Sequence, residues 1–380
     1  MKSQHIKEEK REIAESWKNV GTDFIVHYNE IARRFIDYIY TDKNDNMVFS
    51  PLSIIVLLSM LAGATAGNTR AEIVALLNDK LDYNDIRNQA HALLACLNIS
   101  GDLKSANAAC VDGEIRDSIK EDYAIELREF YDGELFSSMN AAKDTNRWIS
   151  KKTEGAIQTL FQEPDCIISC LVNAVSFDAK WQDKYEDDDV QEGDFTNSDA
   201  SLATVEMLQS EEKRYIESDT YIGFIKNYKR GDFSFMAILP KKKGSGNLRR
   251  CLNGIDFTQA FKSSEAEKVT VIMPEFSFSK NLDIKEFCKK EGIREAFTPE
   301  ADFSSMSREW LKVEELIHSA KVEVDRKGTK AQAVTLAAIG YGCALDVFEK
   351  KIVDLDRPFI YAIMHNATNL PIFIGVVNNL

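Results

Sequence analysis

The chain has 380 residues, of which 44% are hydrophobic and 28% are charged, and its formal net charge at pH 7 is −14. Such an acidic composition argues against general nucleic-acid binding, which needs a basic surface, and against attraction to anionic membranes. The hydrophobic content is ample for a large core, and no low-complexity run divides the chain. We therefore expect one large domain and neither a nucleic-acid nor a membrane partner.

The N-terminal part of the chain predicts a polar arm followed by helices. Residues 1–20 are charged and polar, so we expect the domain itself to span residues 21–380. Apolar residues recur at helical spacing between residues 24 and 39. Ser50 and Pro51 are placed as the N-cap and first-turn proline of a buried helix. Its apolar run, Ile54 to Ala64, is far shorter than the roughly 20 residues of a membrane-spanning helix.

The remaining elements follow the same periodicities, with helices mostly first and strands mostly later. This order, with pairing between distant strands, predicts an α+β architecture. The expected helices lie at 70–95, 119–130 and 140–160, the strands at 106–113, 168–180, 203–240, 268–278, 320–325, 359–365 and 371–377, and helices or turns at 282–297 and 306–312.

Cysteine usage and the first residues bear on the cellular compartment. The N-terminus has no apolar stretch of the kind found in secretory signals, so we expect a cytoplasmic protein or one that leaves the cell by a non-classical route. The seven cysteines are an odd number at scattered spacing. That pattern favours free thiols over a disulfide framework.

No motif in the sequence predicts an enzyme, a cofactor or a metal site. A nucleophile elbow, a phosphate loop and a His-Glu-x-x-His sequence are all missing. The densest basic cluster is Lys241 to Lys243 with Arg249 and Arg250. A glycosaminoglycan site there stays open as an alternative, but a solvated turn around Gly244 is favoured.

The most unusual stretch is a long segment, about residues 328–356, that lies between two strand patterns. Loops longer than about 15 residues in compact domains are usually functional or disordered. Side chains alternate between two faces in a strand. Lys330 and Gln332 fall on one face, and the other carries only small uncharged residues, namely Thr329, Ala331, Ala333 and Thr335. The pattern predicts a loop that can become a buried strand.

This loop and several other segments resemble the serpin family of serine protease inhibitors. The matching segments follow the order of the family from about residue 24 to residue 378. They include Asn46 to Ile54, Asn146 to Trp148, Leu171 to Trp181, Met273 to Phe278, His318 to Thr329, Arg357 to Phe359 and Pro371 to Val377. The resemblance implies the serpin fold, with three β-sheets, about eight or nine helices and an exposed reactive-centre loop.

The resemblance also implies a mechanism and roles for particular residues. A protease cleaves the loop and forms an acyl-enzyme, and the loop then inserts into the main sheet and traps the protease. The implied hinge residues are Gly328, Thr329, Ala331, Ala333 and Thr335. The implied shutter residues, which bridge central strands, are Ser50, Ser53, Asn173 and His318. Trp181 matches the tryptophan of the breach, or core, region.

The sequence departs from the family pattern at three places. Arg326 and Lys327 stand where inhibitory members usually have glutamates. Gln332 and Val334 stand where small residues are usual, and the chain ends in Asn379-Leu380 instead of proline.

The scissile bond follows from two counts that disagree. Counting forward from the hinge places the bond after Gly342, with Tyr341 and Cys343 beside it. Counting back from Pro358 gives Val347, or residues 344–346 if the exit segment is longer, so Leu345 is another candidate. These residues favour chymotrypsin-, cathepsin G- or elastase-like targets, bound covalently by a monomeric inhibitor without a cofactor. The alternatives are a non-inhibitory chaperone, carrier or storage protein, and an inhibitor of cysteine proteases.

Overall fold

A computed structural model describes residues 11–40, 45–161, 169–329 and 351–380. Contacts divide the chain into two compact units, each made of three stretches of sequence. The first unit comprises residues 1–38, 49–176 and 279–321, and the second comprises residues 39–48, 177–278 and 322–380. Both units therefore depend on contacts between residues far apart in the chain. The single domain expected over residues 21–380 stays a prediction.

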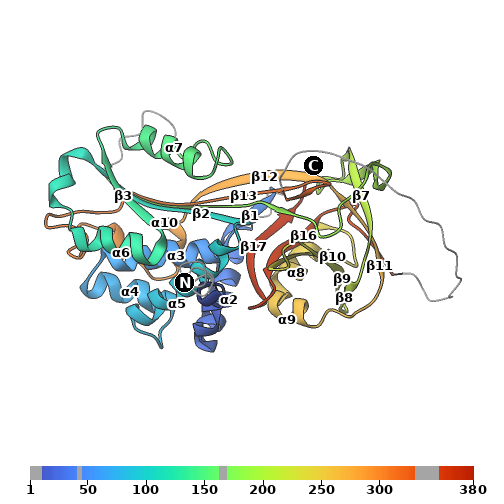
Figure 1. Ribbon diagram of the computed structural model, residues 1–380, viewed down its shortest axis with the longest axis horizontal. Coiled ribbons are helices and arrows are strands. Elements are labelled where there is room, and N and C mark those ends of the chain that lie inside the picture. The colour runs from blue at the N-terminus through green and yellow to red at the C-terminus, as the bar shows by residue number, and fades with distance from the viewer. Residues whose placement is uncertain (1–10, 41–44, 162–168, 330–350) are drawn as a thin grey trace, which may run out of the picture. The chain divides into compact units, whose positions relative to one another are not determined.

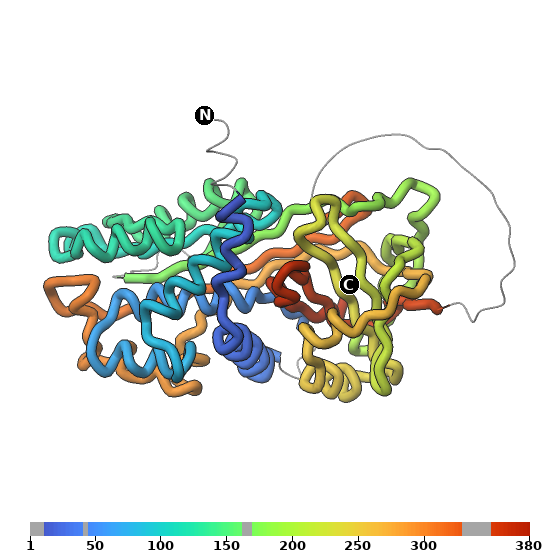
Figure 2. Tube along the Cα trace, turned by 60° about the horizontal axis from the view of Figure 1, so that its bottom comes forward, coloured from blue at the N-terminus to red at the C-terminus, as the bar shows by residue number. Residues whose placement is uncertain are grey.

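The first unit is built around a five-stranded sheet with the order β12-β13-β4-β2-β3. Its central strands β13 (Glu315–Val324) and β4 (Ser169–Phe177) are parallel and run side by side, in orange and green, in Figure 2. Every residue of β4 is buried, as expected for a strand covered on both faces. The other strands are β2 (Leu103–Asp112), β3 (Gly133–Ser138) and β12 (Phe276–Asp283).

Helices cover both faces of this sheet (Figure 1). On one face lies α7 (Ala141–Lys152), and on the other lie α3 to α6. The start of α3 (Pro51–Ala64) confirms the predicted cap, because the Ser50 hydroxyl accepts the Ser53 N–H at 3.3 Å. The remaining helices of this unit are η1 (Ser16–Asn19), α2 (Thr22–Ile39), α4 (Gly67–Leu77), α5 (Tyr83–Ile99), η2 (Gly113–Ser118), α6 (Glu121–Tyr131), α10 (Lys285–Lys290) and η4 (Glu295–Phe297).

The structure corrects several predicted boundaries. α7 ends at Lys152 and not near residue 160, because Glu154 and Gly155 both take positive φ angles, which a right-handed helix cannot continue. β13 begins at Glu315, five residues before the predicted strand. Residues 306–312, predicted as helices or turns, form turns and irregular structure.

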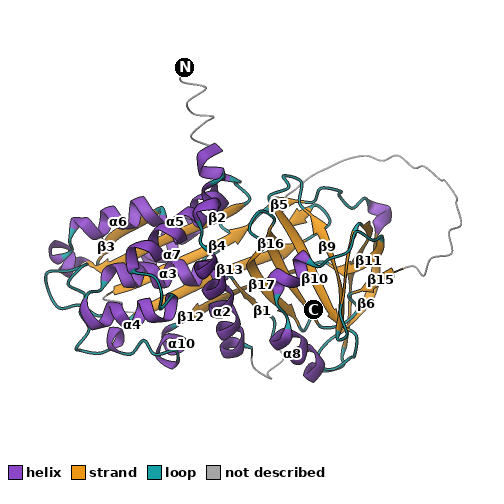
Figure 3. Cartoon of the chain, turned by 90° about the horizontal axis from the view of Figure 1, so that it is seen from below, coloured by secondary structure: helices purple, strands orange, loops and turns teal. Residues whose placement is uncertain are grey.

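The second unit contains the two other large sheets (Figure 3). One has the strand order β1-β17-β16-β10-β9-β8, and the other has the order β15-β11-β7-β6. A short pair, β5 (Ala179–Lys180) with β14 (Gly328–Thr329), adds to them. The other elements are β1 (Met47–Phe49), η3 (Asp187–Asp189), β6 (Val190–Thr196), β7 (Leu202–Glu212), β8 (Arg214–Glu217), β9 (Tyr221–Asn227), β10 (Phe233–Pro240), α8 (Ser245–Gly254), α9 (Phe257–Lys262), β11 (Val269–Pro274), β15 (Lys351–Asp354), β16 (Phe359–His365) and β17 (Leu370–Val377).

A buried ion pair lies inside the second unit. The Lys226 side chain is only 3% exposed, and its Nζ lies 2.6 Å from Glu212 Oε1 and 4.5 Å from the centre of the Tyr185 ring. The Ser210 hydroxyl donates to the same carboxylate oxygen at 2.8 Å. Removing one member of such a pair leaves an uncompensated buried charge.

We therefore expect Lys226→Met to lower the free energy of unfolding by about 3–5 kcal/mol. Lys241→Met is the matched control, because Lys241 pairs with Glu217 on the surface, where both side chains are more than a third exposed. We expect this control to change stability by no more than about 1 kcal/mol. Denaturant unfolding of the two variants makes the comparison, and equal losses would show that the buried charge has no special role.

Candidate functional site

The structure describes the two ends of the predicted reactive loop. The loop begins after β14, which pairs with β5, and ends at β15, which belongs to the four-stranded sheet. Several residues predicted for the hinge and the scissile bond lie outside the described residues, and their roles stay predictions: Ala331, Ala333, Thr335, Tyr341, Gly342, Cys343 and Leu345.

The chain reverses direction in a tight turn between β13 and β14. The Asp325 carboxylate accepts the N–H groups of Lys327 at 2.8 Å and of Gly328 at 3.0 Å. The Asp325 N–H donates to the Gly328 carbonyl at 2.9 Å. An aspartate that bonds backbone two and three residues ahead stabilises a turn in this way. Gly328 and Thr329 therefore run antiparallel to the end of β13.

Gly328, the first predicted hinge residue, packs directly against the backbone of β5. It is paired with Lys180, and Thr329 is paired with Ala179. Its φ angle is +153°, and a Cβ atom at this position would overlap the Ala179 carbonyl. Only glycine allows such a close approach of two backbones. The hinge thus begins as a short strand already paired with the segment that follows β4.

Trp181 donates hydrogen bonds to the backbone of this turn. Its side chain is fully buried and stacks on Tyr228, with the ring centres 4.6 Å apart. The indole Nε1 donates to the Asp325 carbonyl at 2.8 Å, and the Trp181 N–H donates to the Lys327 carbonyl at 3.2 Å. The tryptophan expected in the breach or core region therefore contacts the backbone of the turn.

Arg326 lies within the turn and contacts several carboxylates. Glu275 Oε1 accepts the Arg326 N–H at 2.9 Å and its Nε at 3.3 Å, and Glu206 Oε2 lies 2.7 Å from its NH2. Asp187 lies 3.6 Å from NH1. The hydrogen bond from Arg326 lowers the pKa of Glu206, whereas burial raises the pKa of Glu275 despite the same partner. The arginine is therefore matched by acidic partners.

Sequence reasoning identified Arg326 as a departure but missed its partners. An arginine in place of the expected glutamate brings a positive charge, which nearby carboxylates can compensate. Glu275 stood in the recognised Met-Pro-Glu segment, but its sequence distance from Arg326 gave no sign of the contact.

The predicted shutter residues lie in the first unit and are all buried. His318 on β13 is the register partner of Asn173 on β4. The Ser50 N–H donates to His318 Nε2 at 3.1 Å, and Ser50 in turn caps Ser53. Asn173 instead donates to Asn107 Oδ1 on β2 at 2.6 Å. Three predicted residues thus form one chain of hydrogen bonds, and Asn173 belongs to a second that sequence reasoning missed.

Two polar atoms remain unpaired at the seam between β13 and β4. Within the described residues, neither His318 Nδ1 nor Asn173 Oδ1 has a hydrogen-bond partner. An unsatisfied buried polar group costs about 1–3 kcal/mol. Burial also lowers the pKa of His318 to about 3, so the ring is neutral at physiological pH. The seam is therefore closed by the backbone ladder without a side-chain bond between these two residues.

The structure places the predicted basic cluster and also bears on metal-binding clusters and membrane-spanning helices. The basic cluster lies at the start of α8, where Lys241 pairs with Glu217 at 2.9 Å and Lys243 lies 3.8 Å from Asp356. In the described part of the chain, no cluster of three or more histidine, cysteine or acidic side chains is arranged for a metal ion. None of the helices in that part is long and apolar enough to cross a membrane.

Comparisons with known proteins agree on one family. A family model described as Serpin (serine protease inhibitor) matches residues 27–380. Serpin B6 of Pongo abelii is 28% identical over 362 residues, which cover 88% of this chain and 93% of the relative. The native state of the thermophilic serpin tengpin is similar with a TM-score of 0.85, 30% identity and 95% of each chain covered. Thyroxine-binding globulin in complex with thyroxine has a TM-score of 0.80 at 24% identity, covering 96% of this chain and 98% of that one, which shows a similar fold alone.

The buried histidine predicts acid sensitivity. Between its ordinary pKa of 6.5 and the folded value of about 3, the unfolded chain binds a proton at His318 that the folded chain does not. The free energy of unfolding should therefore fall, by about 1.4 kcal/mol per pH unit for this group, as the pH drops below about 6.5. We expect His318→Gln to reduce this slope, measured by denaturant unfolding between pH 7 and pH 4. Parallel slopes for the two proteins would contradict the assignment.

The carboxylates around Arg326 predict a charge-swap experiment. Arg326→Glu places a fourth acid beside Glu275 and Glu206, and we expect it to lower the free energy of unfolding by about 1 kcal/mol, because the site is partly exposed. Adding Glu275→Lys should restore part of the loss. Lys327→Glu, next in the chain, is the control and should have a smaller effect. A double variant no better than Arg326→Glu alone would exclude a direct Arg326–Glu275 interaction.

Proposed function

This chain belongs to the serpin family and has the serpin fold, and from that premise we propose that it is a suicide-type inhibitor of serine proteases. Family members in general inhibit proteases and are not themselves enzymes. In the proposed mechanism, the protease cleaves the loop between β14 and β15 and remains attached as an acyl-enzyme. The freed loop then inserts between β13 and β4 as an additional strand and carries the protease with it.

The position of β14 is the observation that carries this proposal. The turn at Asp325 to Gly328 reverses the chain, so that the loop begins antiparallel to β13. Gly328 and Thr329 are already paired with β5, the segment that directly follows β4. In the proposed mechanism, a strand continued from this point enters between β13 and β4, where its backbone would gain hydrogen bonds on both sides.

The seam between β13 and β4 also supports the proposed insertion of the loop. The unpaired His318 Nδ1 and Asn173 Oδ1 make the closed sheet less stable than one in which both atoms have partners. Separating β13 from β4 breaks no side-chain hydrogen bond between these two residues. A strand inserted between them would bring new backbone and side-chain groups to both atoms.

The proposed target preference and most of the proposed hinge rest on residues outside the described part of the chain. Thr329, Ala331, Ala333 and Thr335 give one face of the inserted strand only small uncharged side chains, as insertion into a buried sheet requires. Cleavage near Tyr341, Gly342, Cys343 or Leu345 fits chymotrypsin-, cathepsin G- or elastase-like proteases. We further propose that the inhibitor acts as a monomer.

The test is to mix the purified protein with chymotrypsin, cathepsin G, elastase and trypsin and to analyse the products on denaturing gels. We expect a denaturant-resistant complex with at least one of the first three proteases and none with trypsin. The N-terminal residue of the released C-terminal peptide identifies the scissile bond. The cleaved inhibitor should melt at a much higher temperature, because insertion adds a buried strand.

A pair of hinge variants provides the matched control. Ala331→Arg places a charge on the face that must enter the sheet, and we expect cleavage without a stable complex. Gln332→Arg places the same charge on the opposite face and should keep complex formation. Cleavage of the unmodified protein without any complex and with no rise in melting temperature would favour a non-inhibitory chaperone, carrier or storage role. Complexes formed only with papain-like proteases would favour the cysteine-protease alternative.

A further inference from the structure

Two buried cysteines face each other on neighbouring strands of the five-stranded sheet. Cys110 lies on β2 and Cys170 on β4, and neither is more than 1% exposed. Both are free thiols and belong to one apolar cluster. The proposed inhibitory mechanism gives them no role.

The hydrogen bond between Asn107 and Asn173 indicates the alignment of β2 with β4, and two further pairs agree with it. Asn107 is hydrogen-bonded to Asn173, Ala106 shares a cluster with Ala174, and Cys110 shares one with Cys170. In each pair, a step forward along β2 is matched by an equal step back along β4. This is an antiparallel register in which the paired residues lie directly opposite one another. Cys110 is therefore the cross-strand partner of Cys170.

The spacing of such a pair suits a disulfide. Directly opposite residues of antiparallel strands have Cβ atoms about 4.5–5.5 Å apart. A disulfide needs Cβ atoms about 3.5–4.5 Å apart and Cα atoms about 4.4–6.8 Å apart. Closing the bond thus requires only a small local contraction of the two strands.

We propose that Cys110 and Cys170 form a redox site, which a peroxide oxidises to a disulfide that ties β2 to β4. The cross-link joins β4 to its neighbour on the side away from β13. The β13–β4 seam stays free of any covalent bond, so the oxidised protein keeps the seam that loop insertion requires. Formation of the disulfide does not depend on the proposed inhibitory function.

The chemistry needs only the two thiols and one peroxide molecule. The Cys110 thiol releases its proton, and the thiolate attacks one peroxide oxygen. The O–O bond breaks, and the displaced hydroxide takes up the released proton, so that a sulfenic acid and one water are formed. The Cys170 sulfur then attacks the Cys110 sulfur, and the displaced hydroxide leaves as a second water with the proton of Cys170. The two thiols lose two electrons in total, and the peroxide gains them.

The surroundings of the two thiols indicate which of them reacts first with peroxide. The adjacent Cys170 thiol lowers the pKa of Cys110, whereas the contact with Cys110 and burial raise the pKa of Cys170. Thiolates are the reactive form of cysteine, so Cys110 is the first to be oxidised and Cys170 resolves the sulfenic acid.

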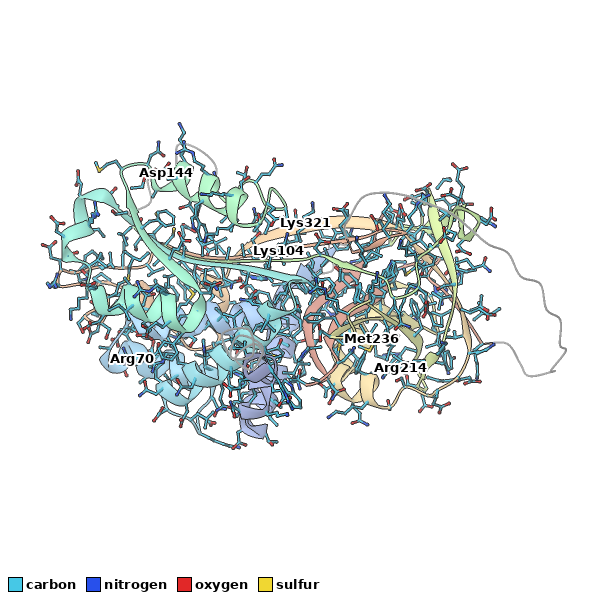
Figure 4. The ribbon with its side chains drawn as sticks, in the orientation of Figure 1. Arg70, Lys104, Asp144, Arg214, Met236 and Lys321 are labelled. Carbon is cyan, nitrogen blue, oxygen red and sulfur yellow. The ribbon has the colours of Figure 1, made fainter. Side chains whose placement is uncertain are left out.

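Access to the site is controlled by α7, which covers this face of the sheet (Figure 4, where Asp144 marks α7 and Lys104 marks β2). The helix segment is tied down by ion pairs and hydrogen bonds. Lys104 Nζ lies 2.6 Å from Glu154, and Trp148 Nε1 donates to Glu134 at 3.1 Å. Small peroxides therefore reach the thiols only when α7 moves, and oxidation is slow compared with that of an exposed thiol.

The test exposes the full-length protein to hydrogen peroxide and maps its peptides by mass spectrometry without reduction. We expect one cross-linked peptide pair that joins Cys110 to Cys170 with the loss of two hydrogen atoms. The melting temperature should rise by several degrees, because the link closes a long chain loop, and dithiothreitol should reverse the rise. Trp148→Ala, which loosens α7, should speed the reaction several-fold.

Substitutions separate this pair from the other cysteines. Cys110→Ser and Cys170→Ser should each abolish the cross-link, whereas Cys288→Ser, an equally buried control, should leave it intact. The proposal is overturned if peroxide gives sulfinic acid at Cys110 without a cross-link. It is also overturned if Cys170 pairs with Cys166, or if both thiols stay reduced after α7 is loosened. The mapping of the unmodified protein decides the question even if a serine variant fails to fold.

Discussion

The seam between β13 and β4 is the feature on which the proposed function depends. These two strands form the centre of the five-stranded sheet and come from segments more than a hundred residues apart in the chain. Their register pairs residues 315–321 with residues 170–176, but the side chains of His318 and Asn173 do not bond across it. On the other side of β4, Asn107 binds Asn173 and Cys110 faces Cys170. At this level of the sheet, Asn173 thus has a side-chain hydrogen bond to β2 and none to His318 on β13.

The turn that leads into the loop is positioned by hydrogen bonds from its surroundings. The backbone N–H groups of Arg326, Lys327 and Gly328 are all accepted by carboxylates, from Glu275 and Asp325. Trp181 binds two of the turn's carbonyls, at Asp325 and Lys327. These polar contacts are specific in direction, yet several are partly exposed and individually weak. The turn is therefore well positioned without being permanently fixed, as a hinge requires.

The fold by itself does not decide between inhibition and transport. A thyroxine-binding globulin with bound thyroxine shares the architecture at low sequence identity. What favours inhibition here is local: a hinge that begins as a paired strand and a loop face free of charge. Function in this family of structures is thus carried by the site and not by the arrangement of helices and strands.

The sequence by itself determined the local elements and the family. Apolar spacing predicted a helix between residues 24 and 39, Ser50 and Pro51 predicted the start of α3, and Gly328 and Trp181 were recognised as positions in the site. Helix ends and the start of β13 were less well predicted, because backbone strain and strand pairing decide them. Only the tertiary structure revealed the Asn107–Asn173 bond, the carboxylates of Arg326 and the Cys110–Cys170 pair. The physical reason is the same in each case: these contacts join residues that are distant in sequence, and local periodicity carries no information about which distant strand becomes a neighbour.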